Sequence, residues 1–248
     1  MEVLGIDIGG TGTKGGLVNI QTGEMVSERF RLDTPRPSTP EAVIATAAKV
    51  VEHFSYDGPI GCGFPAIIKN GTAYSAANID KSWIGTNACK LLQDATGSDI
   101  YVCNDADLAG IAEIEHGAGK GEKGVVLMIT IGTGLGSALF MDGELVPNTE
   151  LGHLYLKGMD KIAEKFAAAS SKKKDDLNWE EWAERFNIYL KMINRLFSPD
   201  LVILGGGGSK KYEKYEEHLI DDVRIKPAEM LNNAGIIGAA IYAYKKHQ

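Results

Sequence analysis

A chain of 248 residues with 44% hydrophobic residues can bury one large core or two smaller ones. Its formal net charge of −7 argues against a nucleic-acid or membrane-surface partner, and no stretch approaches the ~20 apolar residues of a membrane span. The three cysteines, Cys62, Cys89 and Cys103, have no C-x-x-C spacing and the chain enters an apolar segment at once, so we expect reduced thiols in a cytoplasmic protein without a targeting segment.

The first half of the chain alternates predicted strands with predicted helices. Thr39 or Ser38 can cap the first helix, Asn70-Gly71 is a strong hairpin turn, and Gly97 is placed to end the second helix. The expected strands lie at residues 3–8, 15–20, 25–32, 60–64 and 99–103. The expected helices lie at residues 40–54, 84–96 and 106–118.

The second half repeats the opening plan. It begins with a strand pair at residues 125–140, which ends in a tight turn at Asp142-Gly143. The later elements are helical segments at 161–169 and 179–197, separated by the run Lys172, Lys173 and Lys174, then a strand at 201–204 and a terminal helix at 234–244. Two similar halves of alternating strands and helices predict an α/β protein with two lobes. We expect a smaller lobe at 1–103 plus 232–248 and a larger lobe at 104–231.

A glycine-rich strand–turn–strand unit occurs twice, at residues 4–18 and 127–140. Glycines at such turns let bare backbone N–H groups approach a ligand, and threonine hydroxyls add donors. A hairpin with glycine at its turn is also ordinary structure, so either copy alone favours that interpretation. Two copies together predict phosphates gripped from two sides. The predicted phosphate contacts are Gly9, Gly10, Thr11, Gly12, Thr13 and Lys14 in the first copy and Gly132, Thr133 and Gly134 in the second.

The two copies differ at one position that carries chemistry. Asp7 is the only ionisable residue between Glu2 and Lys14, and Thr130 takes its place in the second copy. An acid within an apolar strand is costly to bury without a partner. A hydrated Mg²⁺ on a phosphate is a natural partner, so we expect Asp7 to hold Mg²⁺ through water.

Asp105 is the leading candidate for a catalytic base. It follows a predicted strand and precedes a predicted helix, where it could accept a proton from an alcohol during phosphoryl transfer. The competing interpretation is a helix N-cap, because asparagine and aspartate are both preferred there. The neighbouring Asn104 could itself be the cap or could hydrogen-bond a polyol.

The segment Glu150-Leu-Gly-His153 follows the second glycine-rich copy in a polar loop. A carboxylate and an imidazole separated by glycine could hold adjacent hydroxyls of a sugar. By spacing alone, a surface glutamate and an ordinary loop histidine are the commoner interpretation. The pair offers too few ligands for a metal site.

These motifs, in this order, resemble the ROK family of bacterial sugar kinases and repressors, and within it the branch that uses polyphosphate. The resemblance covers nearly the whole chain. It is carried by Leu4-Gly-Ile-Asp-Ile-Gly-Gly-Thr-Gly-Thr-Lys14, Gly63-Phe-Pro-Ala66, Asn78-Ile-Asp-Lys-Ser-Trp83, Asn104-Asp-Ala-Asp107, Ile131-Gly-Thr-Gly-Leu-Gly136, Glu150-Leu-Gly-His153 and the glycine run that ends at Gly208. It implies the actin-like ATPase (ribonuclease H-like) fold, with two α/β lobes and the active site in the cleft between them.

The resemblance also implies roles for single residues. Phosphoryl transfer would go to the 6-hydroxyl of glucose, with Asp105 as the base. The sugar would be held by Asn78, Asn104, Asp105, Glu150 and His153. The donor would be held by the two glycine-rich turns together with Gly206 and Gly207. Many relatives carry a zinc-binding cysteine cluster after the histidine of the E-x-G-H motif, whereas residues 154–159 here contain no cysteine, so we expect no zinc site. The family's second sugar-binding glutamate has no clear match.

The phosphoryl donor is the least determined feature. Polyphosphate needs a basic track, for which the candidates are Lys14, Lys120, Lys123, Lys172, Lys173, Lys174, Lys210 and Lys211. We expect polyphosphate with weaker use of ATP, and a homodimer as in the family. The alternatives are an ATP-dependent glucokinase or other hexose kinase, a sugar-responsive repressor, and an actin-like chaperone or filament protein. A repressor would carry a helical DNA-binding segment ahead of the sugar domain, whereas the first strand is expected at residue 3.

Overall fold

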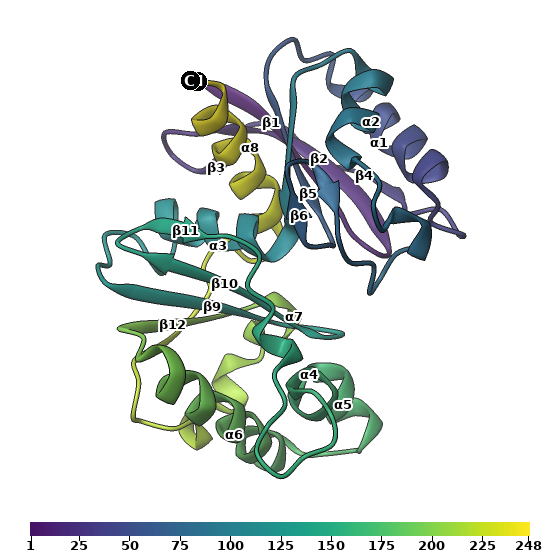
Figure 1. Ribbon diagram of the computed structural model, residues 1–248. Helices are drawn as coiled ribbons and strands as arrows, with labels where there is room; N and C mark the ends of the chain where they lie inside the picture. The colour runs from purple at the N-terminus through teal and green to yellow at the C-terminus, as the bar shows by residue number, and fades with distance from the viewer. The chain divides into compact units, whose positions relative to one another are not determined.

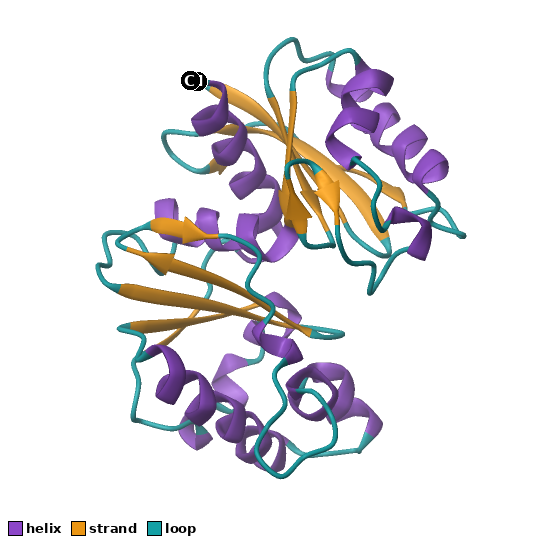
Figure 2. Cartoon of the chain, viewed as in Figure 1, coloured by secondary structure: helices purple, strands orange, loops and turns teal.

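The computed structural model describes residues 1–248, which form two compact units (Figure 1). The first unit comprises Met1–His116 and Asn233–Gln248, and the second comprises Gly117–Asn232. Each unit combines a sheet with helices (Figure 2). No helix in either unit has the length and apolar character needed to cross a membrane.

The sheet of the first unit has six strands in the order β3-β2-β1-β5-β8, with β4 also paired to β2. The hairpin strands β1 and β2 are antiparallel, whereas β5 and β8 run parallel to β1. The carboxyl ends of β1, β5 and β8 therefore meet at one edge of the sheet, where ligands bind in sheets of this kind. The strands are β1 (Glu2–Ile8), β2 (Gly12–Asn19), β3 (Glu24–Met25), β4 (Phe30–Asp33), β5 (Ile60–Phe64) and β8 (Ile100–Asn104).

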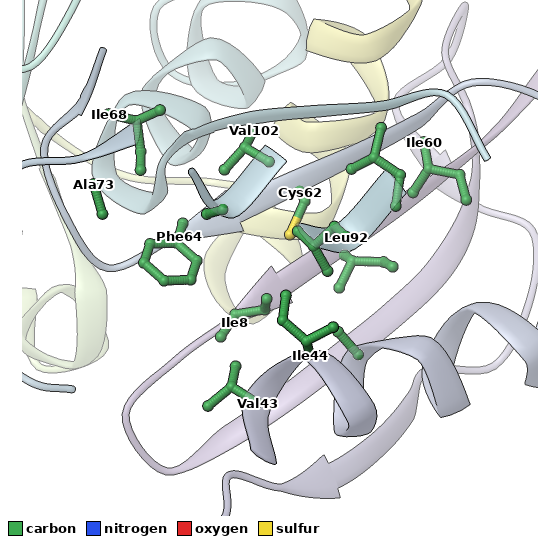
Figure 3. Packing of buried hydrophobic residues seen from close by; sticks show 14 of the residues in the cluster. Ile8, Val43, Ile44, Ile60, Cys62, Phe64, Ile68, Ala73, Leu92 and Val102 are labelled. Carbon is green, nitrogen blue, oxygen red and sulfur yellow. The ribbon is translucent and has the colours of Figure 1, made fainter. Parts of the chain in front are cut away.

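Helix α1 (Pro40–Phe54) covers the core on one face of this sheet, with α2 (Ala88–Thr96) beside it. Thr39 caps α1, as predicted, by accepting a hydrogen bond from the Ala42 N–H. The side chains of Val43 and Ile44 on α1 lie in one buried cluster with Ile8 (Figure 3). A small hairpin, β6 (Ile68–Lys69) with β7 (Thr72–Ala73), and a single turn, η1 (Lys81–Trp83), complete this part.

Helices α3 (Asp105–His116) and α8 (Ala234–His247) pack together in the first unit. A Cβ at Gly238 of α8 would overlap the carbonyl oxygen of Leu108 on α3, so the two backbones are in direct contact. Likewise, Gly5 and Gly61 of the sheet lie against carbonyl oxygens of α8. Bare glycines thus bring α8 and α3 close to the strands, and this packing places the first turn of α3 at the edge where β8 ends.

The second unit contains a five-stranded sheet in the order β11-β10-β9-β12-β13. Its hairpin β9–β10 is antiparallel, and β12 runs parallel to β9. Trp182, Phe186 and Tyr189 of α6 are buried in its core. The strands are β9 (Val125–Ile131), β10 (Leu135–Met141), β11 (Glu144–Val146), β12 (Leu201–Gly205) and β13 (Ile225–Pro227). The helices are α4 (Ala163–Ala167), α5 (Ala169–Lys174), α6 (Trp179–Phe197) and α7 (Gly206–Ser209), with single turns η2 (Leu151–His153), η3 (Tyr212–Lys214), η4 (Glu216–His218) and η5 (Leu231–Asn233).

The two repeated hairpins, the first helix, the Asn70-Gly71 turn and the terminal helix are confirmed. The single strand expected at 25–32 is wrong, because two short strands, β3 and β4, pair with β2 in turn. Between β3 and β4 the Ser27 hydroxyl accepts the Leu17 N–H at 2.9 Å. A side-chain oxygen therefore takes the place of a backbone carbonyl as the partner of β2 at this point. Two short edge strands of the second unit, β11 and β13, were not predicted.

Two helix predictions need correction, and one boundary differs. The helix expected from residue 84 begins at Ala88, because the side chain of Asn87 accepts the Lys90 N–H at 2.8 Å and caps it there. The lysine run expected as a link lies within α5. We placed residues 104–116 in the second lobe, whereas α3 belongs to the first compact unit because it packs on α8.

Candidate functional site

The first glycine-rich turn joins β1 to β2 and is held by its own backbone and by one threonine. The Gly9 N–H donates to the Gly12 carbonyl at 2.9 Å, and the buried Thr34 hydroxyl donates to the Gly9 carbonyl at 2.6 Å. Of the two threonines in this turn that were predicted to contact phosphate, Thr11 is exposed, but Thr13 is fully buried and its hydroxyl has no hydrogen-bond partner. The buried Thr13 is therefore not accessible to a phosphate, whereas the exposed Thr11 is.

Asp7 has a partner that the sequence did not reveal. Its carboxylate pairs with the Lys14 ammonium at 2.9 Å, and the two residues face each other in the β1–β2 ladder. The carboxylate also lies at the first turn of α8, where a Cβ at Gly235 would be 2.7 Å from it. The positive end of a helix favours an anion. Asp7 is therefore an ion-paired acid whose side chain is 13% exposed.

The geometry around Asp7 also bears on a metal ion. No group of three or more histidine, cysteine or acidic side chains surrounds a common point in the chain. A Mg²⁺ ion commonly binds proteins through one or two carboxylates, with water and substrate phosphates as its other ligands. A single partly buried carboxylate beside a glycine-rich turn fits that mode of binding.

Asn104 and Asp105 follow β8, and the structure separates their roles. The Asn104 side-chain oxygen accepts the N–H groups of Ala106 at 2.9 Å and Asp107 at 3.1 Å, and its amide donates to the Ala66 carbonyl at 3.1 Å. Asn104 is therefore the N-cap of α3 and is 7% exposed. Asp105 is half-buried and accepts a hydrogen bond from the Ala106 N–H at 2.8 Å. Asn104 thus caps α3, and the Asp105 carboxylate shares one of the two capped N–H groups with it.

Asn78 lies on an exposed segment that touches the first glycine-rich turn. A Cβ at Gly10 would be 3.0 Å from the Asn78 carbonyl oxygen, so the two backbones are in contact. The segment is anchored by Ser38, whose hydroxyl accepts the Asp80 N–H and whose carbonyl accepts the Trp83 indole N–H, both at 3.0 Å. The backbone of Asn78 is therefore held beside the first glycine-rich turn.

The second glycine-rich turn, between β9 and β10, is held by α5. The Gly132 N–H donates to the Gly134 carbonyl at 3.0 Å, and the Ser170 hydroxyl donates to the Thr133 carbonyl at 2.6 Å. Gly206 and Gly207 follow β12 and are exposed, and Gly206 adopts a φ of +74° against the backbone of Ile131. The two glycine segments predicted to hold the donor in this unit are therefore neighbours.

Glu150 and His153 flank the single turn η2, which rests on β10. The Leu151 N–H donates to the Ser137 hydroxyl at 2.9 Å, and a Cβ at Gly152 would overlap the Leu135 carbonyl. The His153 Nδ1 lies 3.9 Å from the Glu150 carboxylate. Burial raises the pKa of Glu150 above its ordinary value, an effect that the charge of His153 opposes and that of Glu164 reinforces.

Glu164, at the start of α4, lies beside these residues and was not among the predicted site residues. Its side chain is 16% exposed and pairs with Lys165 at 3.0 Å. Its carboxylate lies against Gly134 of the second turn, and its charge acts on Glu150. The fold alone brings it there, since residues 154–162 separate it from the E-x-G-H motif. Within that segment Leu156 is buried in the core.

Comparison with known proteins places the chain in a family. The model of the ROK family matches residues 3–165, and the chain belongs to this family. It is 45% identical over 239 residues to a polyphosphate glucokinase of Mycobacterium tuberculosis (strain CDC 1551 / Oshkosh), covering 96% of this chain and 89% of that one. A polyphosphate glucokinase of Mycobacterium leprae (strain TN) is 42% identical, with 96% and 73% covered.

Solved structures confirm the predicted fold class. The structure of an inorganic polyphosphate/ATP-glucomannokinase from Arthrobacter sp. strain KM matches with a TM-score of 0.93 and 47% identity, and the match covers 99% of each chain. A ROK family glucokinase from Streptomyces griseus, solved with glucose and AMPPNP, matches with a TM-score of 0.79 at 23% identity, covering 99% of this chain and 100% of that one. The actin-like ATPase fold is therefore the fold of this chain.

Proposed function

We propose that this protein is a glucokinase that transfers a phosphoryl group from polyphosphate, and less efficiently from ATP, to the 6-hydroxyl of glucose. The similarity to polyphosphate glucokinases over 96% of the chain supports the reaction and the donor. The observation in the structure that carries the proposal is the capping of α3 by Asn104. Asn104 supplies this cap, and the half-buried carboxylate of Asp105 lies beside it at the edge where β8 ends, a position at which ligands bind in such sheets and from which it can act as a general base.

In this reaction the glucose O6 forms a bond to the terminal phosphorus, and the bond from that phosphorus to the bridging oxygen breaks. Asp105 accepts the proton of the 6-hydroxyl as the new bond forms. The polyphosphate leaves one phosphate shorter, and when ATP is the donor the leaving group is ADP. We assign the backbone N–H groups of both glycine-rich turns, with Gly206 and Gly207, to binding of the donor.

We assign the sugar hydroxyls to Asn78, Glu150 and His153, together with Asp105. Glu150 and His153 offer a carboxylate and an imidazole 3.9 Å apart. Asn104 can contribute less to sugar binding than the sequence suggested. Its side-chain oxygen accepts two N–H groups of α3 and one amide hydrogen is bonded to the Ala66 carbonyl, so one amide hydrogen remains for a sugar.

We propose that Asp7 holds Mg²⁺ through water, with the donor phosphates as the other ligands. When bound, Mg²⁺ neutralises charge on the phosphates. Lys14 then pairs with a phosphate in place of Asp7. We also propose that the protein binds no zinc and that it forms a homodimer. The cytoplasmic location is also a proposal, which the three free thiols support.

The proposal is tested by initial rates of glucose 6-phosphate formation with polyphosphate and with ATP at matched Mg²⁺. We expect faster turnover with polyphosphate, and activity that survives a zinc chelator that spares magnesium. Charge reversal at Lys173 and Lys174, which are exposed on α5, is expected to weaken polyphosphate use more than ATP use. Lys172 is left unchanged, because its ammonium lies 4.5 Å from the ring centroid of Trp179 and donates to the Leu177 carbonyl.

A strong preference for ATP that is insensitive to these charge reversals would indicate an ordinary glucokinase. Calorimetric titration with glucose and with DNA separates the remaining alternatives, because a repressor binds both ligands without turnover. A filament protein is expected to bind neither glucose nor DNA.

Glu150→Gln is expected to weaken glucose binding by about tenfold and yet to raise the melting temperature at pH 7. The raised pKa of Glu150 means that its stabilising contribution is complete only below the unfolded pKa and is lost as pH rises through the folded pKa. At pH 7 the ionised carboxylate therefore costs stability, which the neutral amide restores. Thermal unfolding at pH 7 and at about pH 4 tests the sign, since the difference should fade at the lower pH.

The exposed Glu144 on β11 is the matched control for this variant. Glu144→Gln should change neither glucose binding nor the melting temperature at pH 7. A Glu150→Gln protein with unchanged glucose affinity would contradict the assignment of Glu150 to the sugar.

A further inference from the structure

Arg31 on β4 lies over the outer side of the first glycine-rich turn. Its guanidinium donates to the Thr11 carbonyl at 2.9 Å and to the Asp33 carboxylate at 2.7 Å. A Cβ at Gly12 would be 2.5 Å from Nε and 2.7 Å from Cζ of Arg31, so the absence of a side chain at Gly12 makes room for the guanidinium. Gly12, which was predicted to approach a phosphate, is thus also the residue against which the Arg31 guanidinium packs.

The sheet register aligns Arg31 with the charges already described. Lys14 of β2 faces Asp7 of β1 on one side and Arg31 of β4 on the other. Directly opposed residues of antiparallel strands project from the same face. Asp7, Lys14 and Arg31 therefore form one row across three strands, which leads from the carboxylate assigned to Mg²⁺ outward to β4.

The row can accept further negative charge at its outer end. The Lys14 side chain is 26% exposed, and the Arg31 side chain is 46% exposed. Only Asp33 and the Thr11 carbonyl occupy the Arg31 guanidinium, and its remaining N–H groups are available. Asp33 is itself 85% exposed, and an ion pair so open to water contributes little, so a phosphate can compete with it.

We propose that Arg31 is a donor-binding residue, whose guanidinium binds a non-terminal phosphate of the polyphosphate chain beyond the phosphates held near Lys14. The proposal rests on the proposed function and adds a residue that selects for the length of the anion. A guanidinium binds phosphate oxygens in pairs, and Arg31 is already oriented by its two bonds. A long chain of phosphates can follow the row past Lys14, whereas ATP has a nucleoside where the chain would continue.

The test compares Arg31→Gln and Arg31→Lys with the wild type, using long-chain polyphosphate and ATP as separate donors. Arg31→Gln should raise the KM for polyphosphate by about tenfold, with a smaller change in the KM for ATP. The KM for glucose and the kcat at saturating donor should stay unchanged. Arg31→Lys keeps the charge but loses the fork, so its KM for polyphosphate should fall between the two. The matched control is Arg195→Gln, which removes an exposed, unpaired arginine of α6.

A purely structural role of Arg31 in holding Thr11 would raise the KM for both donors alike, and this result would overturn the proposal. An unchanged KM for polyphosphate would also overturn it. A wild-type protein that makes no glucose 6-phosphate from polyphosphate would instead refute the proposed function. If the wild type is inactive with polyphosphate, calorimetric titration of polyphosphate without glucose still tests the binding site. A tenfold lower affinity of Arg31→Gln than of the wild type would establish that Arg31 binds polyphosphate. Equal affinities of the two proteins would exclude it.

Discussion

Asp105→Asn is expected to lower kcat by about a thousandfold while glucose affinity changes little. The amide keeps the size and much of the hydrogen-bonding capacity of the carboxylate, but it cannot take the proton of the 6-hydroxyl. The measurement is kcat from steady-state glucose 6-phosphate formation, with glucose affinity from calorimetry on the same preparation. Asn104 caps α3, so the melting temperature of the variant should stay close to that of the wild type.

Asp99→Asn is the matched control, because Asp99 is an exposed aspartate that precedes β8 in the same unit. It makes the same change of charge and should leave kcat unchanged. A lower melting temperature for Asp105→Asn with kcat intact would mean that Asp105 acts through the helix start. The assignment of Asp105 as the base would then be wrong.

Asp7→Asn is expected to lower kcat/KM for the donor by about a hundredfold at fixed Mg²⁺, and to raise the Mg²⁺ concentration needed for half-maximal rate. An amide binds a hydrated cation less well than a carboxylate does. Lys14 also loses its partner at 2.9 Å and would remain as an unbalanced positive charge beside the turn. Rates measured over a range of Mg²⁺ concentrations give both quantities.

The Mg²⁺ dependence distinguishes two roles of Asp7. If Asp7 only orients Lys14, the rate should fall while the half-maximal Mg²⁺ concentration stays unchanged, and the metal assignment would then be wrong. Asp99→Asn again serves as the control, since it removes an aspartate of the same unit that lies outside the turn. It should alter neither the rate nor the Mg²⁺ dependence.

Sequence reasoning found most of the elements that carry the site, because their signals are local. Glycine and threonine between two apolar runs predict a tight turn wherever they occur, and both copies form the hairpins β1–β2 and β9–β10. The same local logic placed Asp105 just past β8, at a strand end where ligands bind. It could not choose between Asn104 and Asp105 as the cap, because both residue types cap helices equally well.

The sequence by itself determined the family, the α/β class and the residues at the strand ends, since these depend on patterns a few residues long. Only the tertiary structure decided where the charged side chains around the two turns lie. Lys14 faces Asp7, Arg31 lies over Gly12, and Glu164 lies against Gly134. These pairs depend on strand register and on the packing of one element on another, which join residues far apart in the chain. The contact of Gly238 on α8 with the Leu108 backbone likewise decided that α3 belongs to the first unit. The sequence shows Gly238 as a glycine in a helix, but it does not show which backbone packs against it.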